Sequence, residues 1–248
     1  MTVDRRDLDF PIGLSVARVS AILTVPEESR LLFVLAHGAG AGMRHAFLED
    51  ISGRLADRHV ATFRFQFPYM QAGTGRPDAT PVAEATIVAA VQTAGTALPH
   101  LPIIAGGKSF GGRMTSHAAV HHFLPGVRGL AFLGFPLHPP KKPSITRADH
   151  LDRVPMPMLF LQGTRDTLAD LGLIRSVTDR LGDQATLHVV EGGDHSFKVL
   201  KRSGRTDTQV MDDIADVIAD WSQALVGLKG RGNASLDSED GTVNLQLR

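Results

Sequence analysis

The sequence predicts an α/β fold, with a mostly parallel sheet covered by helices on both faces. Strand-like and helix-like segments alternate along nearly all of the 248 residues, and this alternation is typical of βαβ crossovers. The segment LLFVLA at 31–36 is apolar at every position, as expected for a strand that helices cover on both sides. No repeat of about 20 to 50 residues is visible, so a solenoid or a propeller is not indicated.

The first half of the chain contains three strand-like and two helix-like segments. Residues 15–26 alternate and are rich in Val and Ile, which predicts a half-buried edge strand of antiparallel type. The buried strand at 31–36 leads through a glycine-rich loop into a helix over 46–58, whose apolar residues recur at helical spacing. A strand at 60–65 and a Gly/Pro-rich loop precede an Ala- and Val-rich helix over 82–97.

The second half continues the same alternation, starting with a strand at PIIAGG that runs directly into a helix-like segment. The strand-like segments here are 102–107, 129–135, 158–163 and 186–193, and the helix-like segments are 109–123, 168–181 and 207–225. Beyond residue 226 the apolar periodicity is lost. The sequence therefore predicts a single domain over residues 1–226 and a mobile tail over residues 227–248.

Composition excludes several classes of protein. Lys and Arg number 26, as do Asp and Glu, so a basic nucleic-acid-binding face is not indicated. The longest apolar runs fall far short of about 18 residues, so we expect no membrane span. The N-terminal residues lack the apolar region of a signal peptide, which favours a cytoplasmic location. The chain has no cysteine, which excludes disulfides, thiolate metal sites and a cysteine nucleophile.

A G-x-S-x-G motif, GKSFG at 107–111, lies between the strand at 102–107 and the next helix. In a nucleophile elbow, small residues on either side of the serine permit a sharp turn that exposes the hydroxyl above the sheet. This context favours Ser109 as a nucleophile, and the alternative is a turn serine that caps the helix. A P-loop would need glycine at Pro102, and a dinucleotide fingerprint would need glycine at Met43 or His45. Neither nucleotide-binding motif is therefore present.

A serine nucleophile needs a histidine base, and the base needs a carboxylate to orient it. Asp166 follows the strand at 158–163, and His195 follows the strand at 186–193. In a parallel sheet the ends of these strands lie at the edge where ligands bind. We therefore predict Ser109, His195 and Asp166 as a catalytic triad, in the chain order of α/β-hydrolases.

Other acidic and histidine side chains are weaker candidates because of their positions. Asp170 falls within the following helix, and Asp194, directly beside His195, is better placed to shape the turn. His188 lies inside a strand, whereas His121 and His122 come late in the helix after the elbow.

The triad would also need hydrogen-bond donors for the oxyanion that develops during acyl transfer. The backbone N–H of Phe110, directly after the nucleophile, is one candidate. The second should come from the HGAGAG loop, where Ala39 is favoured over Gly40. The alternative for this segment is a simple flexible connection between strand and helix.

Five short motifs, HGAGAG, GGKSFGGR, FPLHPPKK, GTRD and DHSF, make residues 15–226 resemble the α/β-hydrolase superfamily. More specifically, these motifs resemble a small hydrolase-like group that includes a testis-expressed protein and a subunit of the nonspecific-lethal acetyltransferase complex. Dienelactone-hydrolase-like proteins are more distant, and their nucleophile is a cysteine where this chain has Ser109. The resemblance implies an eight-stranded, mostly parallel sheet whose second strand is antiparallel, with Ser109, Asp166 and His195 as nucleophile, acid and base. It implies no particular substrate, since some relatives look like scaffolds.

The segment after GLAFLGF is too short for a lid domain, which predicts little or no lid and an open site for small, soluble acyl substrates. His37, Tyr69, Met70 and His138 are candidate substrate-binding residues, although Tyr69 and Met70 could equally anchor a loop.

The sequence thus predicts a serine hydrolase that cleaves a carboxylic ester, a thioester or a related acyl bond through an acyl-enzyme. It needs no metal or organic cofactor and binds neither nucleic acid nor membrane. A catalytically silent interaction module, and an acyltransferase or peptidase with the same triad, stay open as alternatives, as does the oligomeric state.

Overall fold

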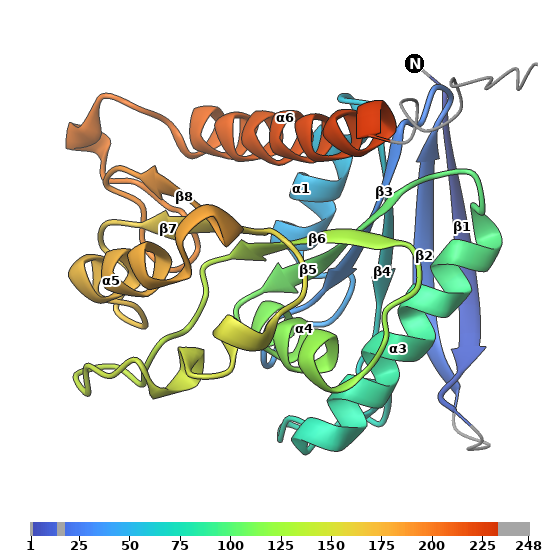
Figure 1. Cartoon of the computed structure of the whole chain (residues 1–248), viewed down its shortest axis with the longest axis horizontal. Helices are drawn as coiled ribbons and strands as arrows, with labels where there is room; N and C mark the ends of the chain where they lie inside the picture. The colour runs from blue at the N-terminus through green and yellow to red at the C-terminus, as the bar shows by residue number, and fades with distance from the viewer. Residues whose placement is uncertain (1, 14–17, 233–248) are drawn as a thin grey trace, which may run out of the picture.

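The computed structural model describes residues 2–13 and 18–232, and its centre is one eight-stranded sheet with the order β1-β2-β4-β3-β5-β6-β7-β8 (Figure 1). The strands are β1 (Val3–Pro11), β2 (Arg18–Pro26), β3 (Leu31–Ala36), β4 (Val60–Phe65), β5 (Ile103–Lys108), β6 (Val127–Leu133), β7 (Met158–Gly163) and β8 (Ala185–Val190). Strand β2 is antiparallel to both of its neighbours, β1 and β4, and the other pairs are parallel. This is the mostly parallel sheet, with an antiparallel second strand, that the sequence predicts.

Helices cover both faces of the sheet, as predicted. They are α1 (Ala46–Ala56), α2 (Pro68–Gln71), α3 (Thr80–Ala97), α4 (Phe110–His121), α5 (Leu171–Leu181) and α6 (Asp207–Gly232). Helices α1 and α6 lie together on one face, and α3, α4 and α5 lie on the other (Figure 1). Each face has its own buried apolar cluster, because the residues of the central strands alternate between the two sides.

The N-terminal edge of the sheet differs from the prediction. The segment Val3–Pro11 forms an additional strand, β1, so β2 lies inside the sheet and is not the edge strand expected for residues 15–26. Residues 15–17 lie outside the described residues. Most side chains of β1 are exposed, so this strand carries no apolar pattern, and its backbone pairing with β2 determines its conformation.

The connection between β6 and β7 contains two short 3₁₀ turns, Thr146–Ala148 and Leu151–Arg153, and no lid domain. The open architecture expected from the short segment is thus confirmed. At the C-terminus, α6 runs on to Gly232, past the predicted domain boundary at residue 226. Residues 233–248 of the predicted tail lie outside the described residues.

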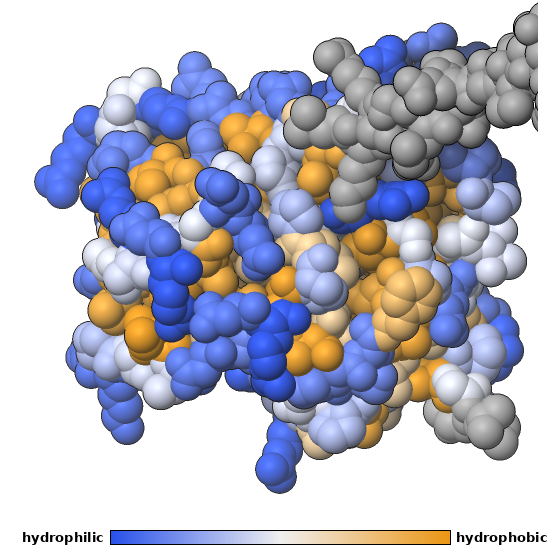
Figure 2. Space-filling view, in the orientation of Figure 1, coloured by the Kyte–Doolittle hydropathy of each residue, from blue (hydrophilic) through white to orange (hydrophobic). Residues whose placement is uncertain are grey.

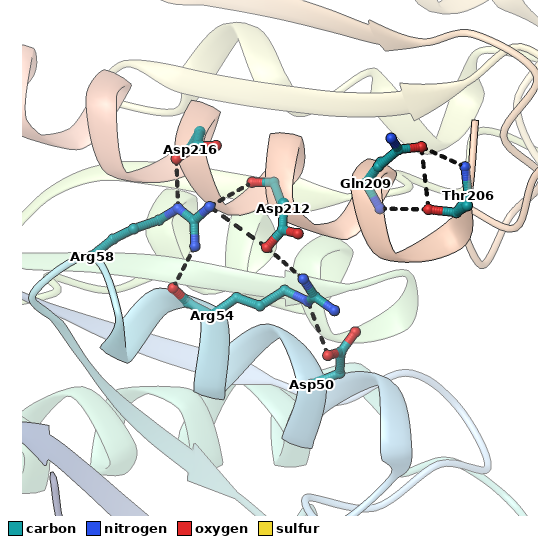
Figure 3. Close-up of polar contacts among 7 residues, drawn as sticks. All are labelled: Asp50, Arg54, Arg58, Thr206, Gln209, Asp212 and Asp216. Carbon is teal, nitrogen blue, oxygen red and sulfur yellow. Dashed lines mark hydrogen bonds and ion pairs between the residues drawn. The ribbon is translucent and has the colours of Figure 1, made fainter. Parts of the chain in front are cut away.

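Ion pairs join α1 to α6 along one side of the sheet (Figure 3). Arg54 pairs with Asp212, and Arg58 Nε donates to Asp216 at 2.6 Å. At the start of α6, Thr206 and Gln209 form a reciprocal capping pair: the Gln209 N–H donates to Thr206 Oγ1 at 3.2 Å and the Thr206 N–H to Gln209 Oε1 at 2.9 Å. Exposed ion pairs each contribute little, but several together fix the relative position of two helices.

Polar and apolar side chains are mixed on the molecular surface. On the face shown in Figure 2, hydrophobic residues lie in separate patches between hydrophilic ones. Among the described residues, no helix combines the length and the apolar composition of a membrane span.

Candidate active site

Three loops at the carboxyl ends of β5, β7 and β8 bring Ser109, Asp166 and His195 together. Ser109 directly follows β5, near the middle of the sheet, whereas Asp166 follows β7 and His195 follows β8. Because these strands are parallel, their carboxyl ends lie at the same edge. Residues that are 86 and 29 positions apart in the chain thereby come into hydrogen-bond contact.

The turn at Ser109 is strained and depends on its flanking glycines. Ser109 has φ +50° and ψ −114°, a left-handed conformation that a non-glycine residue rarely adopts. A Cβ atom on Gly107 would lie 2.2 Å from the Ala36 carbonyl oxygen, and one on Gly111 would lie 2.5 Å from that of His37. The Ser109 side chain makes no capping hydrogen bond to α4. Ser109 therefore does not serve as a helix cap, which was the alternative to its role as a nucleophile.

A continuous hydrogen-bond chain links the three side chains. His195 Nε2 lies 2.9 Å from Ser109 Oγ, and His195 Nδ1 lies 2.7 Å from Asp166 Oδ2. The Asp166 side chain is fully buried, whereas that of His195 is 24% exposed. This geometry can move a proton from the hydroxyl to the imidazole while the carboxylate holds the ring.

Two further donors hold Asp166 in place. Its Oδ1 accepts the Leu168 N–H at 2.8 Å, and its Oδ2 accepts Gln162 Nε2 at 2.5 Å in addition to the imidazole. The contribution of Gln162 was not predicted. Its only signal in the sequence is its position near the end of a strand that is otherwise apolar.

The rival carboxylates have other partners. Asp170 caps α5 by accepting the Leu173 N–H at 3.1 Å. Asp194 accepts the backbone N–H groups of Ser196 and Lys198 at 2.8 and 3.0 Å, and so shapes the turn that carries His195. Neither carboxylate contacts a ring nitrogen of His195 in the described residues.

The loop after β3 lies against Ser109. Gly38 lies so close to Ser109 that a Cβ atom on it would be 3.7 Å from the Ser109 Cβ. The next residue, Ala39, lines the same cleft as Ser109. The Gly40 N–H donates to the Tyr69 hydroxyl at 3.1 Å, so that donor is already used. Among the described residues, the N–H groups of Ala39 and Phe110 have no acceptor, and both are available for an oxyanion.

His37 and Tyr69 support this loop and do not line the cleft, contrary to the prediction. His37 is completely buried; its Nδ1–H donates to the Gly38 carbonyl at 2.8 Å and its Nε2 accepts the Phe67 N–H at 3.1 Å. Burial lowers the pKa of His37 to about 4, so the ring stays neutral and keeps this tautomer. Tyr69 is buried as well, and its hydroxyl is bonded to Gly40.

Met70 and His138 are also absent from the lining of the cleft. Met70 packs against the apolar core, consistent with the alternative of a loop anchor. His138 is buried, donates from Nδ1 to the Pro139 carbonyl at 2.9 Å and accepts the Asp170 N–H on Nε2 at 3.1 Å. With both ring nitrogens used inside the protein, His138 has none left for a ligand.

The cleft at Ser109 has a volume of about 330 Å³. Its apolar lining comes from the loop after β3, the start of α1 and the loop after β7, and consists of Ala39, Ala41, Phe47, Leu48 and Leu168. Ser109 and His195 form part of its polar lining. A cleft of this size and character accommodates a small, mainly apolar group next to the hydroxyl.

Lys108 is the feature of the site that the sequence analysis left without a role. Its Nζ is buried, makes no hydrogen bond in the described residues, and lies 5.8 and 5.7 Å from the ring centres of Phe47 and Phe197. Burial lowers the pKa of the amine to about 8, although nearby Asp166 and Asp194 act in the opposite direction. The amine therefore remains mostly charged at neutral pH, held by aromatic faces and by the field of two carboxylates.

The order of the strands, together with a serine, an aspartate and a histidine at the carboxyl edge of the sheet, defines the α/β-hydrolase class of proteins. The model of the family described as alpha/beta hydrolase domain matches residues 29–223. The chain belongs to this family of hydrolases.

Solved structures share the fold at low sequence identity. A dienelactone hydrolase from Anabaena variabilis is 17% identical with a TM-score of 0.70, over 90% of this chain and 98% of that one. The esterase domain of a Rhodothermus marinus protein is 15% identical with a TM-score of 0.67, over 89% and 98%. An α/β serine hydrolase without a lid from Xanthomonas campestris is 17% identical with a TM-score of 0.67, over 88% and 95%.

Proposed function

We propose that this protein is a serine hydrolase that cleaves a carboxylic ester, a thioester or a related acyl bond of a small soluble substrate. The observation that carries the proposal is the hydrogen-bond chain from Asp166 through His195 to Ser109, at the bottom of an open cleft. The likeness to structures described as an esterase domain and as a serine hydrolase without a lid supports the same reaction class.

In the first half-reaction, Ser109 Oγ attacks the carbonyl carbon of the substrate while His195 Nε2 takes the hydroxyl proton. The N–H groups of Phe110 and Ala39 bind the resulting oxyanion. Collapse of the tetrahedral intermediate breaks the acyl bond, and the imidazolium returns the proton to the leaving group. Water then attacks the acyl-enzyme with His195 as base, which releases the acid and restores Ser109.

We expect the enzyme to prefer short acyl groups. The cleft of about 330 Å³ is open and has no lid to cover a long chain, so an extended alkyl group would stay partly in water and gain little from burial. In a series of p-nitrophenyl esters, kcat/KM should be higher for acetate and butyrate than for decanoate. A decanoate ester that is cleaved much faster than the short esters contradicts this expectation.

Labelling with a fluorophosphonate probe tests the proposed reaction directly. The wild-type protein should form a covalent adduct, and Ser109→Ala should form none, because only an activated serine attacks the probe. Ser196→Ala is a matched control, since Ser196 also lines the cleft and should leave labelling intact. A folded wild-type chain that stays unlabelled would favour the alternative, a catalytically silent interaction module.

Several finer assignments belong to the same proposal. The resemblance to the testis-expressed and nonspecific-lethal-complex group rests on the short motifs alone. The same triad could also serve an acyltransferase or a peptidase, and the sequence does not separate these from a hydrolase. A single domain over residues 1–226 and a cytoplasmic location stay predictions as well. Product analysis with and without an added alcohol or amine acceptor separates hydrolysis from acyl transfer.

A further inference from the structure

A cluster of histidines around one buried carboxylate lies on the α3–α4 side of the sheet. Glu84 on α3 is only 5% exposed. His121 Nδ1 lies 3.0 Å from its Oε1, and His122 Nε2 lies 3.2 Å from its Oε2. Among the described residues, no Lys or Arg pairs with Glu84. A buried carboxylate needs compensating partners, and those that the described residues give to Glu84 are imidazoles.

A third side chain completes a set of potential metal ligands. His117 and His121 are four residues apart on α4 and so project from the same face of that helix. One atom from each of Glu84, His117 and His121 lies within 4.8 Å of the other two. Two imidazoles and a carboxylate match the ligand preference of Zn²⁺ and related divalent transition metals.

We propose that Glu84, His117 and His121 form a binding site for a divalent transition-metal ion of the Zn²⁺ class. In a tetrahedral site, ligand atoms are about 3.4 Å apart; the three ligand atoms lie within 4.8 Å of one another, and Glu84 Oε1 and His121 Nδ1, at 3.0 Å, are already about that close, so only a small adjustment is needed. His121 allows this adjustment, because its side chain is 44% exposed and the partner of its Nδ1 hydrogen bond, Glu84, is itself one of the ligands. The same exposure provides an entry path from solvent and leaves a fourth position for water.

The surroundings keep the ligands ready for a metal. The His150 ring stacks on His117 with ring centres 3.8 Å apart and bonds to Ser116 Oγ at 2.8 Å, which fixes the His117 ring plane from one side. Burial lowers the pKa of His150 to about 3 and also lowers that of His117. In the part of the chain that the structure describes, the His117 ring makes no hydrogen bond, so one of its nitrogens is available as a ligand.

Other charged groups near the site set limits on its affinity. Arg113 and Arg153 act on His117 as positive charges, so they oppose a cation as well as a proton. Glu84 supplies the single negative charge, and His122 holds its other oxygen. Coordination through His121 Nδ1, the atom that now bonds to Glu84, requires the tautomer that carries the ring proton on Nε2, so that Nδ1 presents its lone pair to the ion.

The proposed site is separate from the Ser109 cleft and joins two helices. His117 and His121 come seven and eleven positions after Phe110 along α4, distances of about 10 and 16 Å at 1.5 Å per residue. An ion bound here would bridge α3 and α4, which pack against each other. Its expected role is structural, and metal binding should raise the thermal stability of the chain.

Calorimetric titration of the full chain with ZnCl₂, after removal of any purification tag, tests the proposal. The wild type should bind one equivalent, and His117→Ala and His121→Ala should each weaken binding at least tenfold. His100→Ala, which removes an exposed histidine elsewhere, is the matched control and should bind like the wild type. Zn²⁺ should raise the melting temperature of the wild type and of the control, but not of the two variants.

Cobalt substitution provides a second readout that non-specific binding to surface histidines would not produce. Co²⁺ at the proposed site should give the intense d–d absorption of a tetrahedral ion, and His121→Ala should abolish it. His121→Ala decides the matter if His117→Ala fails to fold, because the His121 side chain is half-exposed. A wild type with a Kd weaker than about 100 μM, or variants that bind within tenfold of His100→Ala, would overturn the proposal.

Discussion

Asp166→Asn is expected to lower kcat/KM for a short p-nitrophenyl ester by about 10⁴, the magnitude typical of a triad that loses its carboxylate. The reason is geometric as well as electrostatic. Asp166 Oδ2 accepts from His195 Nδ1 and from Gln162, and Oδ1 accepts the Leu168 N–H. An asparagine side chain has only one oxygen, so its NH₂ group must face a donor in either orientation.

The two outcomes of this mismatch are both damaging to the proposed reaction. If the NH₂ group faces His195, the ring adopts the tautomer that carries its proton on Nε2 and cannot accept the proton of Ser109. If it faces Leu168, a buried N–H loses its acceptor and the loop that carries the carboxylate shifts. The imidazolium that forms during the reaction also loses its neighbouring charge in both cases.

Two other aspartates provide controls for Asp166→Asn. Asp170→Asn and Asp194→Asn keep an oxygen for the backbone N–H groups that these side chains accept, so both variants should retain kcat/KM within about tenfold of the wild type. If kcat/KM of Asp166→Asn is within tenfold of the wild-type value, or if Asp194→Asn loses as much, Asp166 is not the carboxylate that orients His195.

The sheet and the position of this site could be predicted because both depend on strong local signals. An apolar run such as LLFVLA identifies a buried strand, and parallel strands bring their carboxyl ends to one edge. Ser109 and Asp166 each follow such a strand and His195 follows the edge strand β8, so their meeting follows from topology. The glycines around Ser109 add a local steric requirement that no larger residue meets.

Features that depend on three-dimensional partners could not be predicted. Strand β1 is largely exposed, and only its pairing with β2 makes it a strand. His37 and His138 each follow a strand that ends near the cleft, but their ring nitrogens are already used: Nδ1 donates to the carbonyl of the next residue, and Nε2 accepts a backbone N–H from another loop. A sequence pattern indicates which residues are near the site, but not which of them face a ligand.

Lys108 is another residue whose surroundings could not be predicted from the sequence. The motif places it beside Ser109, but it does not show that the side chain is buried. Charged amines are rarely buried without a partner. Here the position at the end of β5 directs the side chain towards the rings of Phe47 and Phe197. The drop of its pKa from 10.5 in the unfolded chain to about 8 in the folded one means that the charged amine destabilises the folded state by roughly 3 kcal/mol at neutral pH.

Lys108→Met is therefore expected to raise the free energy of unfolding at pH 7 by about 1 to 3 kcal/mol, since Met fills a similar volume without a charge. The gain should depend on pH. Below about pH 8 the amine is charged in both the folded and the unfolded chain, and its full destabilisation is present. Between about pH 8 and 10.5 the unfolded chain binds more protons than the folded one, so the wild type regains stability as the pH rises.

Urea unfolding of the two proteins at pH 7 and near pH 10 measures this difference, and the advantage of Lys108→Met should shrink towards zero at the higher pH. Lys142→Met is the matched control, because Lys142 is exposed and its replacement should change stability by less than about 0.5 kcal/mol at either pH. A Lys108→Met variant that is less stable than the wild type at pH 7 would mean that the aromatic rings and the two carboxylates stabilise the charged amine by more than its burial costs. A gain of equal size at both pH values would assign the effect to packing alone.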